Sequence, residues 1–178
     1  NERVEEAIDH YKKAISLKPD YVQAFNNLGV LYKDNEKYED AIKMFMKAKE
    51  LQPDHQNSYY NLALIKKEQG LNEEAIEFLL KVFDLNPDHS EANYLSWLIY
   101  SRLGRFTEGW KYFEYRWKVS PLNKVLWPIQ DRPVWKGERG KRVALWREQG
   151  IGDEIIFLSL VSEVKEMCSS LSVYVDPR

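Results

Sequence analysis

A repeat of 34 residues limits what this chain can fold into more than any other feature of its sequence. Proline recurs at this spacing four times, and four further columns of mostly small or apolar residues keep the same phase. The columns are Pro19, Pro53, Pro87 and Pro121; Ala7, Ala41, Ala75 and Gly109; Tyr11, Phe45, Leu79 and Phe113; Ala14, Ala48, Val82 and Arg116; and Leu17, Leu51, Leu85 and Val119. Columns in one phase indicate a chain built from copies of one small unit.

Between the prolines, the apolar residues have the spacing of two successive helices. In residues 38–51, Ala41, Phe45 and Ala48 fall on one helical stripe, and residues 22–34 carry a second stripe. Small residues, including Gly29 on the first helix of the pair, let the two helices approach closely. The proline after each second helix prevents that helix from continuing.

This pattern closely resembles the tetratricopeptide repeat (TPR). Residues 22–55 match its signature at nearly every position, residues 56–89 match it well, and residues 90–123 are a degenerate copy in which Trp97 replaces glycine. Residues 1–21 supply the second helix of an earlier repeat. The resemblance implies a mainly α fold: a right-handed superhelix of about three and a half helical hairpins in residues 1–119.

In this family the first helices line a concave groove that binds a peptide or a partner protein. Matching residue by residue, the resemblance assigns the groove candidates Asn27, Asn61, Tyr60, Lys33, Lys67 and Tyr94. Asn27 and Asn61 are equivalent, and a carboxamide offers a donor and an acceptor to a peptide backbone. Two interpretations stay open: peptide contact, or an asparagine that is simply common there. Lys33 and Lys67 either meet an acidic peptide or form solvated surface, and Leu95 interrupts the asparagine column.

Charge and composition favour a protein partner over other ligands. The chain has 26 basic and 28 acidic residues, so a net charge of −2 gives no long-range attraction to nucleic acid or anionic lipid. His55 and His89 recur in equivalent turns, His10 stands alone on a helix, and Cys168 is the single cysteine. We therefore expect no nucleic-acid partner, no metal site and no cofactor.

The location of the protein is predicted from what the sequence lacks. No apolar run approaches the roughly 18 residues that span a bilayer, and the N-terminal residues have neither a basic start nor an apolar signal core. We therefore expect no membrane contact and a cytoplasmic location. Because the chain begins in the middle of a repeat, we interpret it as a fragment of a larger protein.

The composition changes after residue 96. All six tryptophans lie beyond it, and Trp110, Phe113 and Trp117 have the spacing of one helical face. A terminal repeat normally presents a polar face to water, so we expect this aromatic face to be covered by residues that come later in the chain. Stacking on sugar rings is the alternative role of the aromatic side chains. Residues 120–140, rich in proline and glycine, are predicted to be an ordered linker.

Residues 141–178 are predicted to be the first βαβ unit of a truncated Rossmann-like domain. A strand in residues 141–146, a glycine loop, a helix from Asp153 to about Met167 and a strand in residues 171–176 form such a unit, with parallel strands. The loop residues Gln149, Gly150 and Gly152 would lie at the carboxyl end of the first strand, where α/β sheets bind ligands. So small a unit is marginally stable alone and is expected to pack on the last repeat or to self-associate.

A second resemblance concerns the junction between the repeats and this unit. The segments EGWKYFEYRW and PVWKGERGKRVALWREQGIGDEIIF look like those of bacterial TPR proteins that continue into a two-lobed (GT-B type) glycosyltransferase-like domain, similar to the heptosyltransferase and O-linked N-acetylglucosamine transferase groups. The resemblance gives Asp153 the role of a base for the acceptor hydroxyl. The competing interpretation is a helix N-cap.

The sequence thus predicts an interaction module that binds a peptide or partner protein in its groove. The alternative is the N-terminal part of a nucleotide-sugar-dependent glycosyltransferase. We expect no activity from these 178 residues, because the donor-binding second lobe cannot be built from the few residues after the linker.

Overall fold

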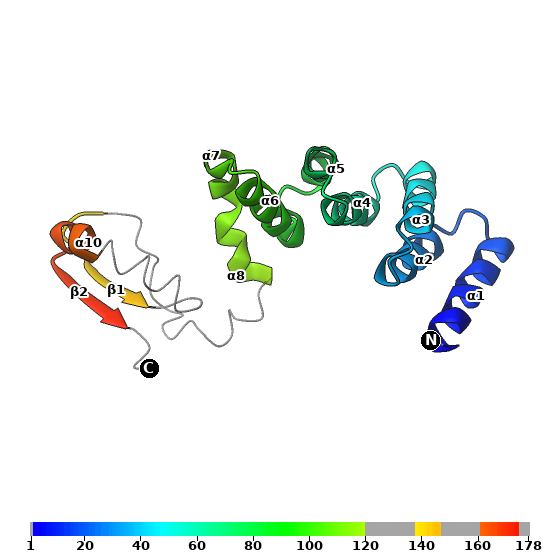
Figure 1. The fold of residues 1–178 in the computed structure, drawn as a ribbon, viewed down its shortest axis with the longest axis horizontal. Coiled ribbons are helices and arrows are strands. Elements are labelled where there is room, and N and C mark those ends of the chain that lie inside the picture. The colour runs from blue at the N-terminus through cyan, green and yellow to red at the C-terminus, as the bar shows by residue number, and fades with distance from the viewer. Residues whose placement is uncertain (1, 120–137, 147–160, 175–178) are drawn as a thin grey trace. The chain divides into compact units, whose positions relative to one another are not determined.

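The computed structural model describes residues 2–119, 138–146 and 161–174. The chain divides into two compact units, Asn1–Val119 and Ser120–Arg178, and each is described by itself. The first unit is a series of helices and the second contains two short strands (Figure 1). The predicted architecture, helical hairpins followed by a short α/β piece, is confirmed.

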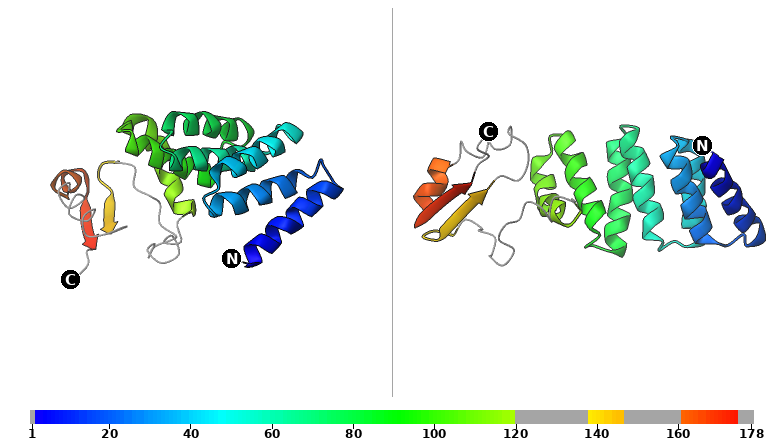
Figure 2. Two further views of the ribbon diagram at one scale, coloured as in Figure 1. Left: turned by 45° about the vertical axis from the view of Figure 1, so that its right-hand side comes forward. Right: turned by 90° about the horizontal axis from the view of Figure 1, so that it is seen from below.

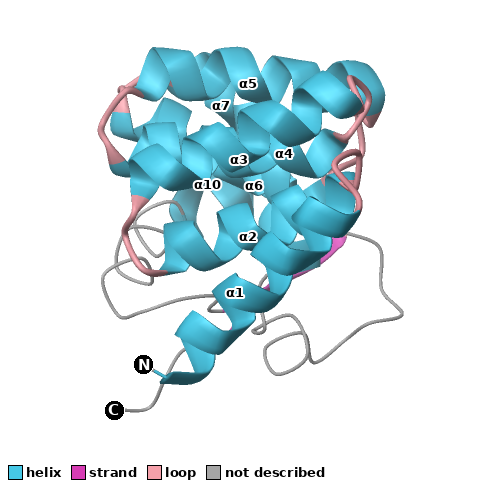
Figure 3. Ribbon diagram, turned by 90° about the vertical axis from the view of Figure 1, so that its right-hand side faces the viewer, coloured by secondary structure: helices cyan, strands magenta, loops and turns pink. Residues whose placement is uncertain are grey.

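The first unit consists of helices joined by short turns, which succeed one another side by side (Figure 2). Its first six helices are α1 (Glu2–Leu17), α2 (Val22–Asp34), α3 (Tyr38–Leu51), α4 (Gln56–Glu68), α5 (Asn72–Leu85) and α6 (Ser90–Arg102). Helices α2 and α3 pair as one hairpin, and α4 and α5 pair as the next. The view from the N-terminal end shows these helices stacked behind one another (Figure 3).

Each hairpin is closed by a small residue on the first helix facing a large one on the second. A Cβ atom on Gly29 of α2 would lie 2.7 Å from Cε1 of Phe45 on α3, so only glycine fits this approach without movement. In the next hairpin the equivalent residues are Ala63 and Leu79, both buried. The combined side-chain volume of the two facing residues is therefore similar in both hairpins: glycine faces the larger phenylalanine, and alanine faces the smaller leucine.

Apolar clusters join one hairpin to the next. Phe45 of α3 belongs to a buried cluster with Leu62 and Ile65 of α4. Leu79 of α5 belongs to a second cluster with Ile99 of α6. The core thus runs along the array through the seams between repeats, so each repeat is stabilised by its neighbour.

The third hairpin departs from this pattern in its second helix. Where α3 and α5 each run for 14 residues, the equivalent segment is broken into α7 (Phe106–Gly109), a 3-10 helix η1 (Trp110–Tyr115) and α8 (Arg116–Val119). Trp97 of α6 replaces the small residue of the earlier hairpins, and its ring lies 4.7 Å from that of Phe113, centroid to centroid. We attribute the break to these two facing rings, because an undistorted helix pair has no room for both.

Gly109 is the compensation for Trp97. A Cβ atom there would lie 2.9 Å from Cβ of Tyr100 and 3.4 Å from Cε3 of Trp97. The equivalent residues of the earlier hairpins, Ala41 and Ala75, are alanines with a smaller residue opposite. Loss of one methyl group on the second helix therefore accommodates part of the added volume on the first.

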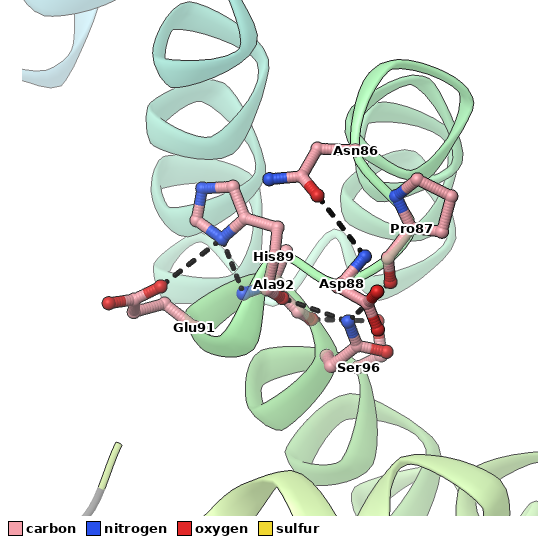
Figure 4. Close-up of polar contacts among 8 residues, drawn as sticks. Asn86, Pro87, Asp88, His89, Glu91, Ala92 and Ser96 are labelled. Atoms are coloured by element: carbon pink, nitrogen blue, oxygen red, sulfur yellow. Dashed lines mark hydrogen bonds and ion pairs between the residues drawn. The ribbon is translucent and has the colours of Figure 1, made fainter. Parts of the chain in front are cut away.

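The turns between hairpins are stabilised by histidine and asparagine side chains. At the start of α6, the backbone N–H of Ala92 donates to Nδ1 of His89 at 3.3 Å, and the Nδ2 group of Asn93 donates to the carbonyl of Pro87 at 2.9 Å. Figure 4 shows this turn, with Oε2 of Glu91 3.2 Å from the same His89 nitrogen. His55 begins α4 in the equivalent place, and its Nδ1 lies 2.8 Å from Oγ of Ser58. Both histidines occupy the N-cap position, but only the His89 side chain accepts a backbone N–H of its helix, whereas His55 contacts the Ser58 side chain.

The second unit contains β1 (Arg142–Trp146), α10 (Val161–Met167) and β2 (Ser170–Tyr174). The two strands are parallel, with Arg142 opposite Ser170 and Trp146 opposite Tyr174. The predicted start of the helix at Asp153 lies outside the described residues. Self-association through this small sheet stays a prediction.

The Gly29–Phe45 contact gives a direct stability test. Gly29→Ala should lower the free energy of unfolding by about 1–3 kcal/mol, because the added methyl overlaps a ring that has no exposed surface. This expected loss is the net change, because the overlap outweighs the roughly 1 kcal/mol that alanine contributes as the better helix former. Denaturant unfolding measures the change.

The chain supplies the control for this test. The double variant Gly29→Ala with Phe45→Leu recreates the Ala63–Leu79 pair of the next hairpin. Its loss of unfolding free energy should be smaller than the sum of the losses in the two single variants. Additive losses in this double-mutant cycle would show that the two positions do not share one contact.

His55 predicts a dependence of stability on pH. Burial lowers the pKa of His55 from its usual value of 6.5, against a smaller opposing effect of Asp54. The folded chain therefore binds this proton less readily than the unfolded chain, so the stabilisation is complete above about pH 6.5 and declines as the pH falls below it. In His55→Asn, which removes the titrating ring, the melting temperature should fall less between pH 7.5 and pH 5 than in the parent. Equal losses would contradict the assignment.

Candidate functional site

The candidate site is the surface formed by one side of the first helices α2, α4 and α6, which we call the first-helix face. It recurs with the repeat because equivalent positions point the same way on each first helix. Its residues are Gln23, Asn27, Val30 and Lys33 on α2; Asn57, Tyr60, Asn61, Leu64 and Lys67 on α4; and Glu91, Tyr94 and Leu98 on α6.

A chain of polar side chains, which we call the amide network, crosses three helices at this face. Nε2 of Gln23 donates to Oδ1 of Asn27 at 3.0 Å, and Nδ2 of Asn27 donates to the Tyr11 hydroxyl of α1 at 3.3 Å. Nδ2 of Asn26 also donates to Oδ1 of Asn27, and Nδ2 of Asn61 donates to Oδ1 of Asn26, each at 3.4 Å. The network therefore runs from solvent into the seam between the first two hairpins.

The two equivalent asparagines have different surroundings. Asn27 is half-buried, whereas Asn61 is only 8% exposed and uses its amide nitrogen on Asn26 of the preceding repeat. Asn61 therefore ties α4 to α2 as well as bordering the face. The sequence did not predict the bonds to Asn26 and Tyr11; the adjacent pair of asparagines at 26 and 27 was the available signal.

Aromatic groups continue the face beyond the amide network. The ring of Tyr60 stacks on that of His89 with centroids 5.2 Å apart, which joins α4 to the turn before α6. Burial raises the pKa of Tyr60, and the nearby Glu91 carboxylate raises it further. Tyr60 therefore keeps its phenolic proton and can donate a hydrogen bond. Tyr94 is half-buried one repeat further along.

The two lysines of the face have intrachain partners. Nζ of Lys33 lies 3.1 Å from a carboxylate oxygen of Asp34, and Nζ of Lys67 lies 2.8 Å from one of Glu68. These side chains are adjacent in sequence and partly solvated, so the pairs contribute little to stability. They do, however, offset the positive charge that an acidic ligand would need.

The predicted loop site lies outside the described residues: Gln149, Gly150, Gly152 and Asp153 are among the positions that the structure does not describe. Among the residues it does describe, no three His, Cys, Asp or Glu side chains converge to hold a metal ion, and no helix has the length and apolar character to cross a membrane. The cytoplasmic location stays a prediction.

The arrangement of the first-helix face suits binding. Carboxamides present donors and acceptors in fixed directions, and Tyr60 adds a hydroxyl group and a flat apolar ring. Val30 and Leu64 lie on the same helices and are half-buried, each packed against the neighbouring core cluster. A ligand would thus meet polar groups in the middle of the face and apolar groups along its side.

Comparison with known proteins agrees with the helical pairs. Residues 1–36 match a family model described as TPR repeat, and residues 22–55 and 56–89 each match one described as tetratricopeptide repeat. Protein FlbA of Caulobacter vibrioides is 35% identical over 66 residues, which cover 36% of this chain and 11% of that protein. The match therefore spans about a tenth of that relative.

Solved structures share the fold. One crystal structure of MamA superposes with a TM-score of 0.59 at 26% identity, covering 67% of this chain and 70% of that one. A second MamA structure gives 0.58 at 23% identity, with 74% and 70% covered, and pilF of Pseudomonas aeruginosa gives 0.57 at 18% identity, with 63% and 51% covered. The family matches together span residues 1–89, half of the chain, and the chain therefore belongs to the tetratricopeptide-repeat proteins.

Proposed function

We propose that the first-helix face binds an extended peptide segment of a partner protein. The tetratricopeptide repeats and their structural neighbours support the broader role, that of a protein-interaction scaffold. The narrower proposal assigns the interaction to one face and to named side chains.

The amide network is the observation that carries this proposal. An extended peptide exposes backbone N–H and C=O groups at regular intervals, and each needs a partner when it leaves water. Gln23 and Asn27 lie at the solvated end of the network. Asn26 donates to Asn27, and Asn61 in turn donates to Asn26, which fixes the orientation of the carboxamides. Side chains held in position before binding lose less entropy when a ligand arrives.

The neighbouring groups indicate what else the peptide carries. Tyr60, braced by its stack on His89, offers an aromatic surface for an apolar or aromatic ligand side chain. Because Lys33 and Lys67 are already paired with Asp34 and Glu68, the face does not require an acidic peptide. Backbone recognition with one or two apolar anchors is the mode that fits these contacts.

The proposal is tested with peptides selected on the full chain from a random display library. Asn27→Ala should weaken binding of the selected peptides by about 1–2 kcal/mol, the value of lost hydrogen bonds to a bound backbone. It should also lower the melting temperature slightly, because Nδ2 of the buried Asn26 loses its acceptor on Asn27. Isothermal titration gives the affinities.

Asn61→Ala and Gln52→Ala complete the series. Asn61→Ala should lower both affinity and stability, because it leaves the buried Oδ1 of Asn26 without its donor. Gln52 is an exposed amide that ends α3, a second helix, so its removal should change neither quantity. Selected peptides that bind all three variants as tightly as the parent would rule out the first-helix face.

The parallel pairing of β1 and β2 favours a second proposal for the residues after 140. We infer that they begin an α/β domain of a longer protein, similar to a two-lobed glycosyltransferase, in which Asp153 is the base. Parallel strands joined by a helix are the starting element of such domains. The repeats would then hold the acceptor protein near the second domain.

The intact protein from its native source tests this second proposal. It should transfer sugar from a nucleotide sugar to a protein acceptor, and Asp153→Asn should reduce the rate by about 100-fold or more, as expected for loss of a general base. Parallel measurements on Asp176→Asn, a carboxylate change elsewhere in the same unit, should show near-parent rates. An intact protein without transfer activity would refute the assignment while leaving the peptide-binding proposal intact.

A further inference from the structure

The end of the third repeat exposes positions that are covered in the first two repeats. Ile42 of α3 packs against the cluster of Leu62 and Ile65 on α4. Its equivalent on α5, Ile76, is 8% exposed and lies in the cluster with Leu95 and Ile99 of α6. In both cases the covering element is the first helix of the next repeat.

The equivalent residue of the third repeat is Trp110, and it is 62% exposed. Phe106, which corresponds to the packed Tyr38 of the first repeat, is 60% exposed, and Leu98, which corresponds to Val30, is 39% exposed. We call Leu98, Phe106 and Trp110 the end face. Three large apolar side chains thus stand where the earlier repeats receive a helix, which marks an interaction surface.

The end face is held rigid from beneath. The ring of Trp110 stacks on that of Phe113 with centroids 4.9 Å apart, and Trp97 meets Trp110 edge-on at 5.8 Å. Gly109 lets α7 approach α6 closely, because a Cβ there would lie 2.9 Å from Cβ of Tyr100 and 3.4 Å from Cε3 of Trp97. A tryptophan fixed by its neighbours binds with little loss of side-chain entropy and is a typical hot-spot residue.

The charge of the third repeat differs from that of the other repeats. Residues 90–119 contain five basic and three acidic residues, whereas residues 22–89 contain eight basic and twelve acidic ones. Arg105 pairs with Glu73 and Glu108, whereas Lys111 and Lys118 lie over aromatic rings, 4.8 and 4.5 Å from their centroids. The aromatic end face is thus part of a repeat with surplus positive charge.

We propose that the end face is a second docking site, which takes an amphipathic α-helix with acidic flanks from a partner protein. The helix is inferred from continuity with the seams between repeats, where the covering helices present apolar residues three or four positions apart, such as Leu62 with Ile65 and Leu95 with Ile99. The acidic flanks are inferred from the surplus positive charge. A second copy placed face to face would bring like charges together. This site lies beyond the proposed peptide-binding function and does not depend on it.

The full chain is tested with a fluorescein-labelled synthetic peptide of residues 56–85. This peptide carries a net negative charge and contains α4, the helix that covers the equivalent face of the first repeat. Fluorescence anisotropy should show saturable binding that is weakened about tenfold or more by Trp110→Glu and by Phe106→Glu. Leu80→Glu, which changes an exposed leucine of α5, should leave the affinity unchanged. Circular dichroism shows whether each variant is folded.

A photo-crosslinker at position 98 identifies the occupant. With benzoylphenylalanine in place of Leu98, cross-links to the peptide, and their loss in Trp110→Glu, support the proposal. Cross-links to residues of the same chain or to a second copy, mapped by mass spectrometry, would overturn it because the face would already be occupied. Absence of peptide binding, or binding that survives both charge variants, would also overturn it.

Discussion

The close approach of the two helices in each hairpin is the constraint on which the rest of the structure depends. Gly29 faces Phe45 in the first complete repeat, and Ala63 faces Leu79 in the second. Because a core is packed at a fixed density, the volume of one partner limits the other. Where Trp97 enters this position, the second helix cannot remain regular and divides into α7, η1 and α8. The same ring contacts Trp110 and Phe113, which lie in the 3-10 helix.

The polar groups of the first-helix face arise from a second feature of the same packing. Seams between repeats are mostly apolar, yet Asn26 and Asn61 meet within one. A buried carboxamide is tolerated only where its donors and acceptors find partners. Asn26 also donates to Asn27, which accepts from the exposed Gln23 and donates to Tyr11 of the preceding helix. The result is a face whose polar groups are already oriented, which is the property that a peptide-binding surface needs.

Repetition made the fold predictable, and local detail made the site harder to predict. The five columns that recur every 34 residues predict helix pairs, because each repeat has mostly small or apolar residues at the same buried positions. Periodicity also located the face of Asn27 and Asn61, but it treats equivalent residues alike. Their burial nevertheless differs, and Asn61 bonds to an asparagine of the preceding first helix, Asn26. Likewise, the spacing of Lys33 and Lys67 indicates a basic column, whereas the acids beside them, Asp34 and Glu68, offset it.

Helix α6 belongs to both proposed surfaces. Tyr94 lies on the first-helix face, and Leu98, one helical turn away, belongs to both that face and the end face. A helix that docks on the end face would therefore border the surface proposed for the peptide. The last repeat thus contributes one helix to both proposed interactions.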